Sequence, residues 1–112
     1  MVSEAWVDIP GHPGYQVSDQ GRVRSVDRVV QGREGSARRV KGRVLTPLVR
    51  PDGLRVVNLW LNNTYCQRPV RELVLVAFDR PCPTGFEAVN VNGDSVDNRL
   101  CNLRWRPSAR GR

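Results

Sequence analysis

The side chains best suited to chemistry are the amides and carboxylates between Glu87 and Trp105. Their oxygens are the kind of ligand that Mg²⁺ accepts, and a metal site could use Asp94, Asp97 and Asn98. The same side chains also bond to nearby backbone groups, and Asn92-Gly93-Asp94 is typical of a tight turn. We therefore expect a rigid loop. The apolar anchors expected to point inward from it are Leu100, Leu103 and Trp105.

Two segments of this stretch resemble the metal-binding finger of HNH endonucleases. They are Val-Asn-Val-Asn-Gly-Asp (89–94) and Asp-Asn-Arg-Leu-x-Asn-Leu-Arg-Trp (97–105). The resemblance implies an oxygen metal ligand, then the histidine general base, then a further acidic position, and these places fall on Val89, Asn90 and Asn92. Val89 has no side-chain oxygen, and Asn90 cannot take a proton from water. We expect a degenerate site with no catalytic residue and no metal.

The family's finger continues into a helix that completes the metal site, and the helix before it often begins with histidine. Here seven residues follow Trp105, fewer than the roughly 12 to 15 at which isolated helices become marginal. Val70-Arg71 stand where the other histidine would be. We therefore expect a truncated ββα (His-Me finger) motif followed by a basic tail over residues 106–112.

The first half of the chain resembles the small nuclease-associated modular domain that precedes HNH cassettes in phage and homing endonucleases. The matching motifs are Trp-x-x-Ile-Pro-Gly (6–11), Gly-Tyr-x-Val-Ser (14–18), Gly-Arg-Val-Arg-Ser (21–25) and Lys-Gly-Arg-Val-Leu-x-Pro (41–47). His12, the single histidine, falls inside this pattern and is interpreted as a loop residue. We expect one domain over residues 1–112, made of a modular segment with a basic hairpin (4–50) and a degenerate HNH-like segment (54–105).

Arginine dominates the charge of this chain, which carries 17 Arg, one Lys and a net charge of +7. Between Arg22 and Arg55 ten basic residues stand against three acids, and the chain from Arg104 adds four arginines. Such a basic segment on a mildly acidic body is typical of a protein that binds a polyanion. The alternative is a solvated charged face that reflects a GC-rich genome. The residues predicted to contact DNA, which we expect to be double-stranded, are Arg22, Arg24, Arg28, Arg33, Arg38, Arg39, Lys41, Arg43 and Arg55.

The cysteines do not indicate a disulfide framework or a zinc site. Cys66, Cys82 and Cys101 are odd in number and widely spaced, and no Cys-x-x-Cys occurs. We expect free, half-buried thiols and no zinc site with His12. The sequence also lacks a phosphate-binding Gly-x-x-x-x-Gly-Lys loop and a histidine for a serine nucleophile.

The local pattern of the first half predicts short strands between turns. Residues 4–25 alternate apolar residues with glycine turns, and the core candidates are Trp6, Ile9, Tyr15, Val17 and Val23. A basic hairpin is expected over residues 27–47, with strands at Val29-Val30 and at Val40–Thr46. The polar, glycine-rich loop between these strands is expected to be mobile without a ligand.

The second half is predicted to hold the longest strand and one helix. The strand is expected over Leu54–Leu61, followed by a turn at Asn62-Asn63. Trp60 and Tyr65 could stack on bases, but aromatic residues on a hairpin are more often part of the core, so the core is favoured. The apolar run Arg71–Phe78 fits a helix or a buried strand, and the family resemblance favours the helix.

Together these features predict a small α+β domain of antiparallel hairpins with one helix and a truncated HNH-like motif. The expected function is DNA binding by a protein derived from an HNH homing endonuclease and lacking nuclease activity, such as a phage or mobile-element regulator. The alternatives are an active Mg²⁺-dependent HNH-type endonuclease and a protein-binding inhibitor of a host factor. Without a long apolar run or a secretion signal, we expect a cytoplasmic protein with no membrane partner.

Overall fold

Short strands separated by turns form the first sheet. The computed structural model describes residues 3–108, and in it β1 (Trp6–Asp8), β2 (Tyr15–Ser18) and β3 (Val23–Ser25) form an antiparallel sheet in the order β1-β2-β3. The turn between β2 and β3 depends on Gly21, which has a φ of +85° that residues with a Cβ rarely adopt. The predicted series of short strands and turns is confirmed.

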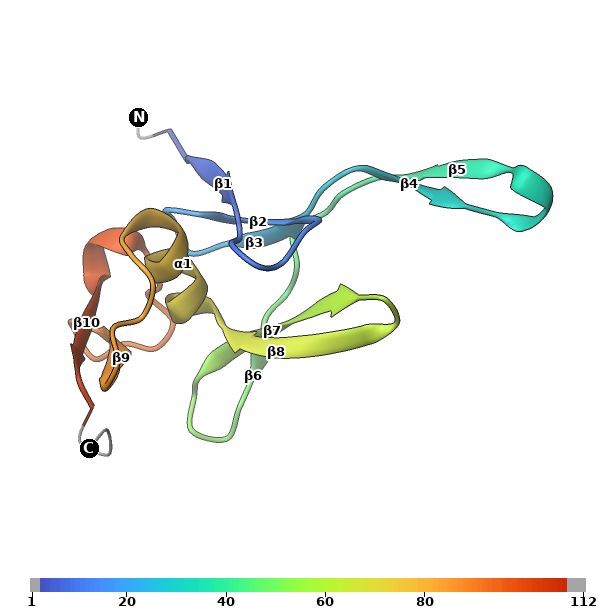
Figure 1. Ribbon diagram of the computed structural model, residues 1–112. Helices are drawn as coiled ribbons and strands as arrows, with labels where there is room; N and C mark the ends of the chain where they lie inside the picture. The colour runs from blue at the N-terminus through green and yellow to red at the C-terminus, as the bar shows by residue number, and fades with distance from the viewer. Residues whose placement is uncertain (1–2, 109–112) are drawn as a thin grey trace.

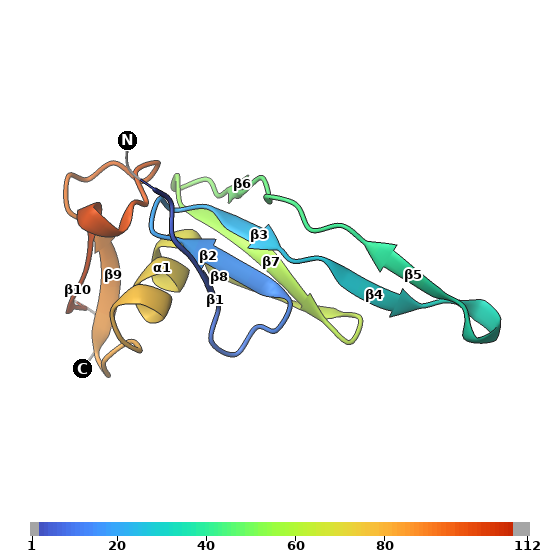
Figure 2. The same cartoon turned by 90° about the horizontal axis from the view of Figure 1, so that it is seen from above.

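A two-stranded hairpin, here called the arm, extends away from the rest of the molecule (Figures 1 and 2). It consists of β4 (Arg28–Gln31), a 3₁₀ turn η1 (Arg33–Gly35) and β5 (Ala37–Val40). The radius of gyration is 15.7 Å, against about 13 Å for a compact chain of roughly 100 residues. The arm therefore adds length to the molecule without adding to its core.

The second strand of this hairpin differs from the prediction, because β5 ends at Val40 instead of beginning there. Arg28 pairs with Val40 at the base of the ladder, so the paired residues are the basic ones before Val40. Residues 41–46 return along β3 instead, where the Leu45 N–H donates to the Val23 carbonyl at 2.8 Å. Gly42 permits this path, because a Cβ there would collide with the Ser25 carbonyl.

A third sheet carries the longest strand of the described chain. It has the order β6-β7-β8, with β6 at Leu48–Val49, β7 at Arg55–Leu61 and β8 at Thr64–Pro69. Asn62 and Asn63 connect β7 to β8 with φ values of 53° and 64°, as a tight hairpin turn with two left-handed residues requires. The prediction of the strand and of its turn is confirmed.

Helix α1 (Val70–Phe78) begins directly after Pro69, a residue whose fixed φ suits a helix start. Its buried residues are Val70, Leu73, Val74 and Leu75. The chain then forms β9 (Phe86–Asn90), a 3₁₀ turn η2 (Leu100–Asn102) and β10 (Leu103–Pro107), and β9 and β10 pair antiparallel. We call residues 86–107 the finger. The finger and the arm lie at opposite ends of the molecule (Figure 2).

One core joins these elements. It contains Ile9, Val17 and Val23 from the first segment, Val57 and Leu59 from β7, the buried face of α1, and Ala88 and Leu103 from the finger. Leu103 is buried, so its predicted inward position is confirmed. Trp6, Tyr15, Leu100 and Trp105, also predicted to be core or inward residues, are only partly buried, and the last three pack against the core without being part of it. The Trp105 ring packs on the edge of the core, and its Nε1–H donates to the Arg80 carbonyl at 3.3 Å.

The predicted fold class is confirmed: the described residues form a small domain of mostly antiparallel strands with one α-helix. Residues 109–112, which include two of the three arginines assigned to the basic tail, lie outside the described residues. Within residues 3–108, no helix is long and apolar enough to cross a membrane.

Trp105→Ala should lower the free energy of unfolding by about 2 kcal/mol, which is less than the roughly 3 to 5 kcal/mol for a fully buried tryptophan, because part of the ring already faces solvent. Denaturant unfolding measures the change. Val96→Ala, at an exposed finger position, is the control and should stay within about 0.5 kcal/mol of wild type. If the two variants were equally stable, Trp105 would not anchor the finger.

Candidate functional site

Asn90 occupies the centre of the finger. Strand β9 alternates so that Ala88 and Asn90 face inward while Val89 faces the other side, and Asn90 is 9% exposed. Its Oδ1 accepts a hydrogen bond from Arg71 Nη1 at 3.0 Å, and its Nδ2 donates to the Asp97 carbonyl and to Asn98 Oδ1, both at 2.8 Å. Both donor hydrogens of this amide are therefore in use.

A second pair of amides closes the loop. Asn102 Nδ2 donates to Asn92 Oδ1 and to the Asp97 carbonyl, both at 2.9 Å, while the Asn92 N–H donates to Asn102 Oδ1 at 3.2 Å. In the described part of the chain, no buried side-chain nitrogen or oxygen lacks a hydrogen-bond partner. The finger is thus held by a satisfied amide network, which a low-dielectric interior makes rigid.

The carboxylates of the finger are also committed to structural contacts. Arg99 binds Asp97 through two hydrogen bonds of 2.8 Å, and this contact lowers the pKa of the Asp97 carboxyl to about 2. Asp94 Oδ1 accepts the Val96 N–H at 3.0 Å, which is a turn contact. The predicted bonding of these side chains within the loop is confirmed.

These residues do not fit the Mg²⁺ ion that the HNH resemblance implies. Val89 presents only hydrocarbon, Asn90 is bonded to Arg71, and Asp97 is neutralised by Arg99. Residues 3–108 contain no group of three His, Cys, Asp or Glu side chains that could hold a metal ion. An amide cannot serve as a general base, so the arrangement at Asn90 supports structure instead of proton transfer.

His12 lies in the loop between β1 and β2, as expected, and its Nε2 lies 3.1 Å from Arg68 Nη1. Its partial burial and the neighbouring Arg68 lower its pKa, so the ring is neutral at pH 7. Its contact partner is on β8 and not on the finger, which gives His12 no place in a site built around Asn90.

The nine predicted DNA-contact residues fall into two groups. Arg22 binds Glu4 (Nε to Oε2, 2.9 Å), Arg24 binds Gln16 and lies 4.1 Å from the centre of the Trp6 ring, and Arg55 donates to the Gly53 carbonyl at 2.6 Å. The other six lie on the arm or just after it, and none of them forms an ion pair with a described side chain. They are Arg28, Arg33, Arg38, Arg39, Lys41 and Arg43. The structure thus brings six of the nine together.

Two residues favoured as core are instead on the surface. Trp60 is 53% exposed and Tyr65 is 55% exposed, and their ring centres lie 4.9 Å apart. They face each other near the tip of the β7–β8 hairpin, beyond the reach of the core. Their position beside the Asn62-Asn63 turn could have indicated this exposure from the sequence, because the tip of a hairpin has few neighbours to cover it. The three cysteines are also exposed, not half-buried.

Asp97→Asn should remove a pH-dependent part of the stability. Because the folded-state pKa of Asp97 is lowered, its ionised form stabilises the fold above the usual carboxyl pKa of about 4, and this contribution is lost as the pH falls toward 2. The free energies of unfolding of wild type and variant should therefore converge between about pH 4 and pH 2. In an Arg99→Gln background, Asp97→Asn should no longer change the pH dependence of the free energy of unfolding. If wild type and Asp97→Asn differed by the same free energy from pH 4 to pH 2, the lowered pKa of Asp97 would be contradicted.

Comparison with known proteins finds similarity to both halves of the chain. Residues 4–60, just over half of the chain, match the model of the NUMOD4 motif. No curated protein sequence matches the chain. A solved structure that describes DNA binding and cleavage by the HNH homing endonuclease I-HmuI is similar over 92% of this chain, with a TM-score of 0.73 and 26% sequence identity.

The chain corresponds to 52% of the length of that endonuclease chain, and the likeness includes both the modular segment and the finger. The resemblance inferred from the motifs at residues 6–47 is therefore confirmed by both comparisons, and that of residues 89–105 by the structural likeness. On this evidence the chain belongs to the NUMOD4 family and is structurally related to the HNH homing endonucleases.

Proposed function

We propose that this protein binds double-stranded DNA through the arm and does not cut it. The observation that carries the proposal is the placement of the basic residues. From Arg28 to Arg43 six basic residues stand against a single acid, on a hairpin that extends away from the body. Exposed arginines without a protein partner leave their guanidinium groups available for phosphate and for guanine edges.

The geometry of the arm suits a DNA groove. A two-stranded antiparallel ribbon fits the major groove, which is about 12 Å wide. Val29 pairs with Arg39 and Val30 pairs with Arg38, so the two neighbouring arginines point to opposite faces of the ribbon. A ribbon lying in a groove would present a guanidinium group to each wall. The relationship to I-HmuI, whose structure describes DNA binding, supports the same ligand class.

The absence of cutting is inferred from the finger. Where the family resemblance implies a ligand and a base, Val89 offers no oxygen and Asn90 is fixed by Arg71, Asp97 and Asn98. The Asn90 amide that stands in place of the family's base cannot accept a proton from water. We infer that the finger now serves as a scaffold that completes the core.

The two segments form one unit in this proposal. The modular segment (4–50) supplies Ile9, Val17 and Val23 to the core, and the degenerate HNH-like segment (54–105) supplies Ala88 and Leu103 to the same core. A shared core supports treating residues 1–112 as one domain that presents a single DNA-binding arm. Whether the bound protein acts as a phage or mobile-element regulator stays a prediction.

Purified protein should neither nick nor cut supercoiled DNA with Mg²⁺ or Mn²⁺. Asn90→His alone should not create activity, because Val89 would still lack an oxygen and residues that act as a unit are not restored singly. Plasmid nicking measured beside a gel shift tests both statements. Metal-dependent cleavage that disappears in Asp94→Ala or Asp97→Ala would establish the active endonuclease instead. If the protein neither cut the DNA nor shifted it in the gel, a protein partner would be favoured.

Binding should depend on salt and on the arm. If about five phosphates are neutralised, log K should fall with log[salt] with a slope of about −4.5. Replacing Arg38, Arg39 and Lys41 with Gln should weaken binding at every sequence and reduce the slope by about 2.7, because phosphate contacts position the protein without reading bases.

The matched control replaces Arg80, Arg104 and Arg106 with Gln, which removes the same charge from exposed positions at the finger end. Fluorescence anisotropy over a salt series measures both variants. If the control lost as much affinity and slope as the arm variant, binding would follow net charge and the arm would have no special role.

A further inference from the structure

The outer face of the β7–β8 hairpin carries an aromatic pair that the DNA-binding arm does not use. Trp60 pairs across the strands with Tyr65, and Asn58 pairs with Gln67 on the same face. The two rings are tilted by 46° and lie 4.9 Å apart, and both are more than half exposed. A large apolar surface exposed in a small domain indicates a contact site.

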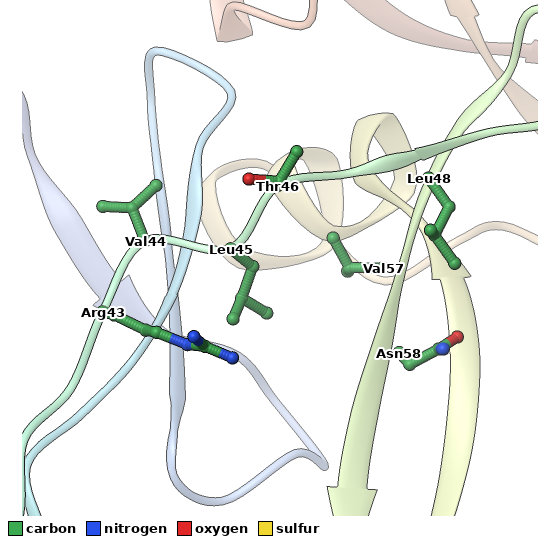
Figure 3. A pocket seen from close by; sticks show the side chains of 7 residues that line it. All are labelled: Arg43, Val44, Leu45, Thr46, Leu48, Val57 and Asn58. Atoms are coloured by element: carbon green, nitrogen blue, oxygen red, sulfur yellow. The ribbon is translucent and has the colours of Figure 1, made fainter.

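This face borders a groove formed by three adjoining hollows. The middle hollow, of about 250 Å³, is lined by Tyr15, Ser25, Arg28, Arg43, Leu45, Asn58 and Trp60. It shares Arg43, Leu45 and Asn58 with a hollow of about 310 Å³ between residues 43–48 and β7 (Figure 3). It shares Tyr15, Arg28 and Trp60 with a third, of about 840 Å³, that continues to Asn62 and Asn63. We call this continuous surface the aromatic groove.

The charge of the aromatic groove indicates the class of its occupant. Arg28 and Arg43 line it, and no Asp or Glu residue lines any of the three hollows. An anionic group next to an aromatic ring is therefore favoured, and a nucleotide combines an anion with a flat ring. An acidic protein segment would match the two arginines but would offer nothing specific to the exposed Trp60 ring.

The groove is also held in place before any ligand binds. The Trp60 backbone N–H donates to Tyr15 Oη at 3.0 Å, and this hydrogen bond connects the hairpin to β2. Gln67 Nε2 donates to Asn58 Oδ1 at 3.1 Å, so Asn58 Nδ2 and Gln67 Oε1 remain available to the edge of a base. A preorganised surface loses less conformational entropy on binding.

We propose that the aromatic groove holds an unpaired DNA base, with its ring stacked on Trp60 and its phosphate beside Arg28 and Arg43. This inference rests on the proposed DNA-binding function. In a perfect duplex the faces of each base are covered by its neighbours, so only an unpaired or extruded base can present a face to Trp60. The arm would bind the duplex, and the groove would recognise a distorted position next to it.

The test compares a fluorescein-labelled duplex with the same duplex carrying one unpaired thymine. Wild-type protein should bind the second about tenfold more tightly, and its tryptophan fluorescence should be quenched on binding. Trp60→Leu should abolish the preference and leave affinity for the perfect duplex unchanged. Trp60→Phe, which keeps a ring, should retain most of the preference while the quenching disappears.

Phe86→Leu is the matched control, because Phe86 is another exposed aromatic residue but lies on the finger. It should leave the preference intact, whereas the arm variant at Arg38, Arg39 and Lys41 should weaken binding to both DNAs equally. Equal wild-type affinity for the two DNAs would overturn the base site and leave arm binding standing. No binding to either DNA would overturn the arm proposal and the groove with it.

Discussion

The buried face of helix α1 is the contact on which the rest of the structure depends. Val70, Leu73, Val74 and Leu75 are the helical residues against which the first sheet, β7 and the finger all pack. Each sheet has only two or three strands, and sheets of this size are not stable alone without a surface to cover. In this chain the helix supplies that surface. A substitution that distorted α1 would therefore loosen the modular segment and the finger together.

The finger shows how a site can keep its frame while its chemistry is replaced. Its loop is fixed from both sides: the amide network holds it internally, and the β2–β3 turn presses on it from the modular segment. The Leu100 N–H donates to the Asp19 carbonyl at 2.8 Å, and a Cβ at Gly21 would lie 2.6 Å from the Asn98 carbonyl oxygen. Buried polar groups that are all satisfied make a rigid scaffold, but they leave no oxygen or nitrogen for a metal or a substrate.

The arm differs from the body in what stabilises it. Its strands contribute nothing to the core, and its ladder and turn alone keep it extended. A hairpin without core contacts opens at a lower free energy than the rest of the fold, which is compatible with the DNA contact proposed for it. The aromatic groove combines features of the arm and the body. The hydrogen bond from the Trp60 backbone to Tyr15 attaches the β7–β8 hairpin to the body, while the rings of Trp60 and Tyr65 remain exposed to solvent.

Several features could be predicted from the sequence because their causes are local. The apolar run after Pro69 with the family pattern predicted α1, Asn62-Asn63 predicted a tight turn, and the arginine-rich segment predicted a charged hairpin. The amino-acid types at Val89 and Asn90 were enough to question catalysis, because no fold gives valine an oxygen or an amide a useful pKa.

Other features were decided only by the tertiary structure. The role of Asn90 depends on Arg71 and Asn98, which reach it from other parts of the chain. The shift of β5 to residues before Val40 follows from pairing with β4, and a local pattern does not set register. Trp60 and Tyr65 are residue types common in cores, yet they lie on the surface. Burial of a strand residue depends on its distance from α1, and the tertiary structure sets that distance.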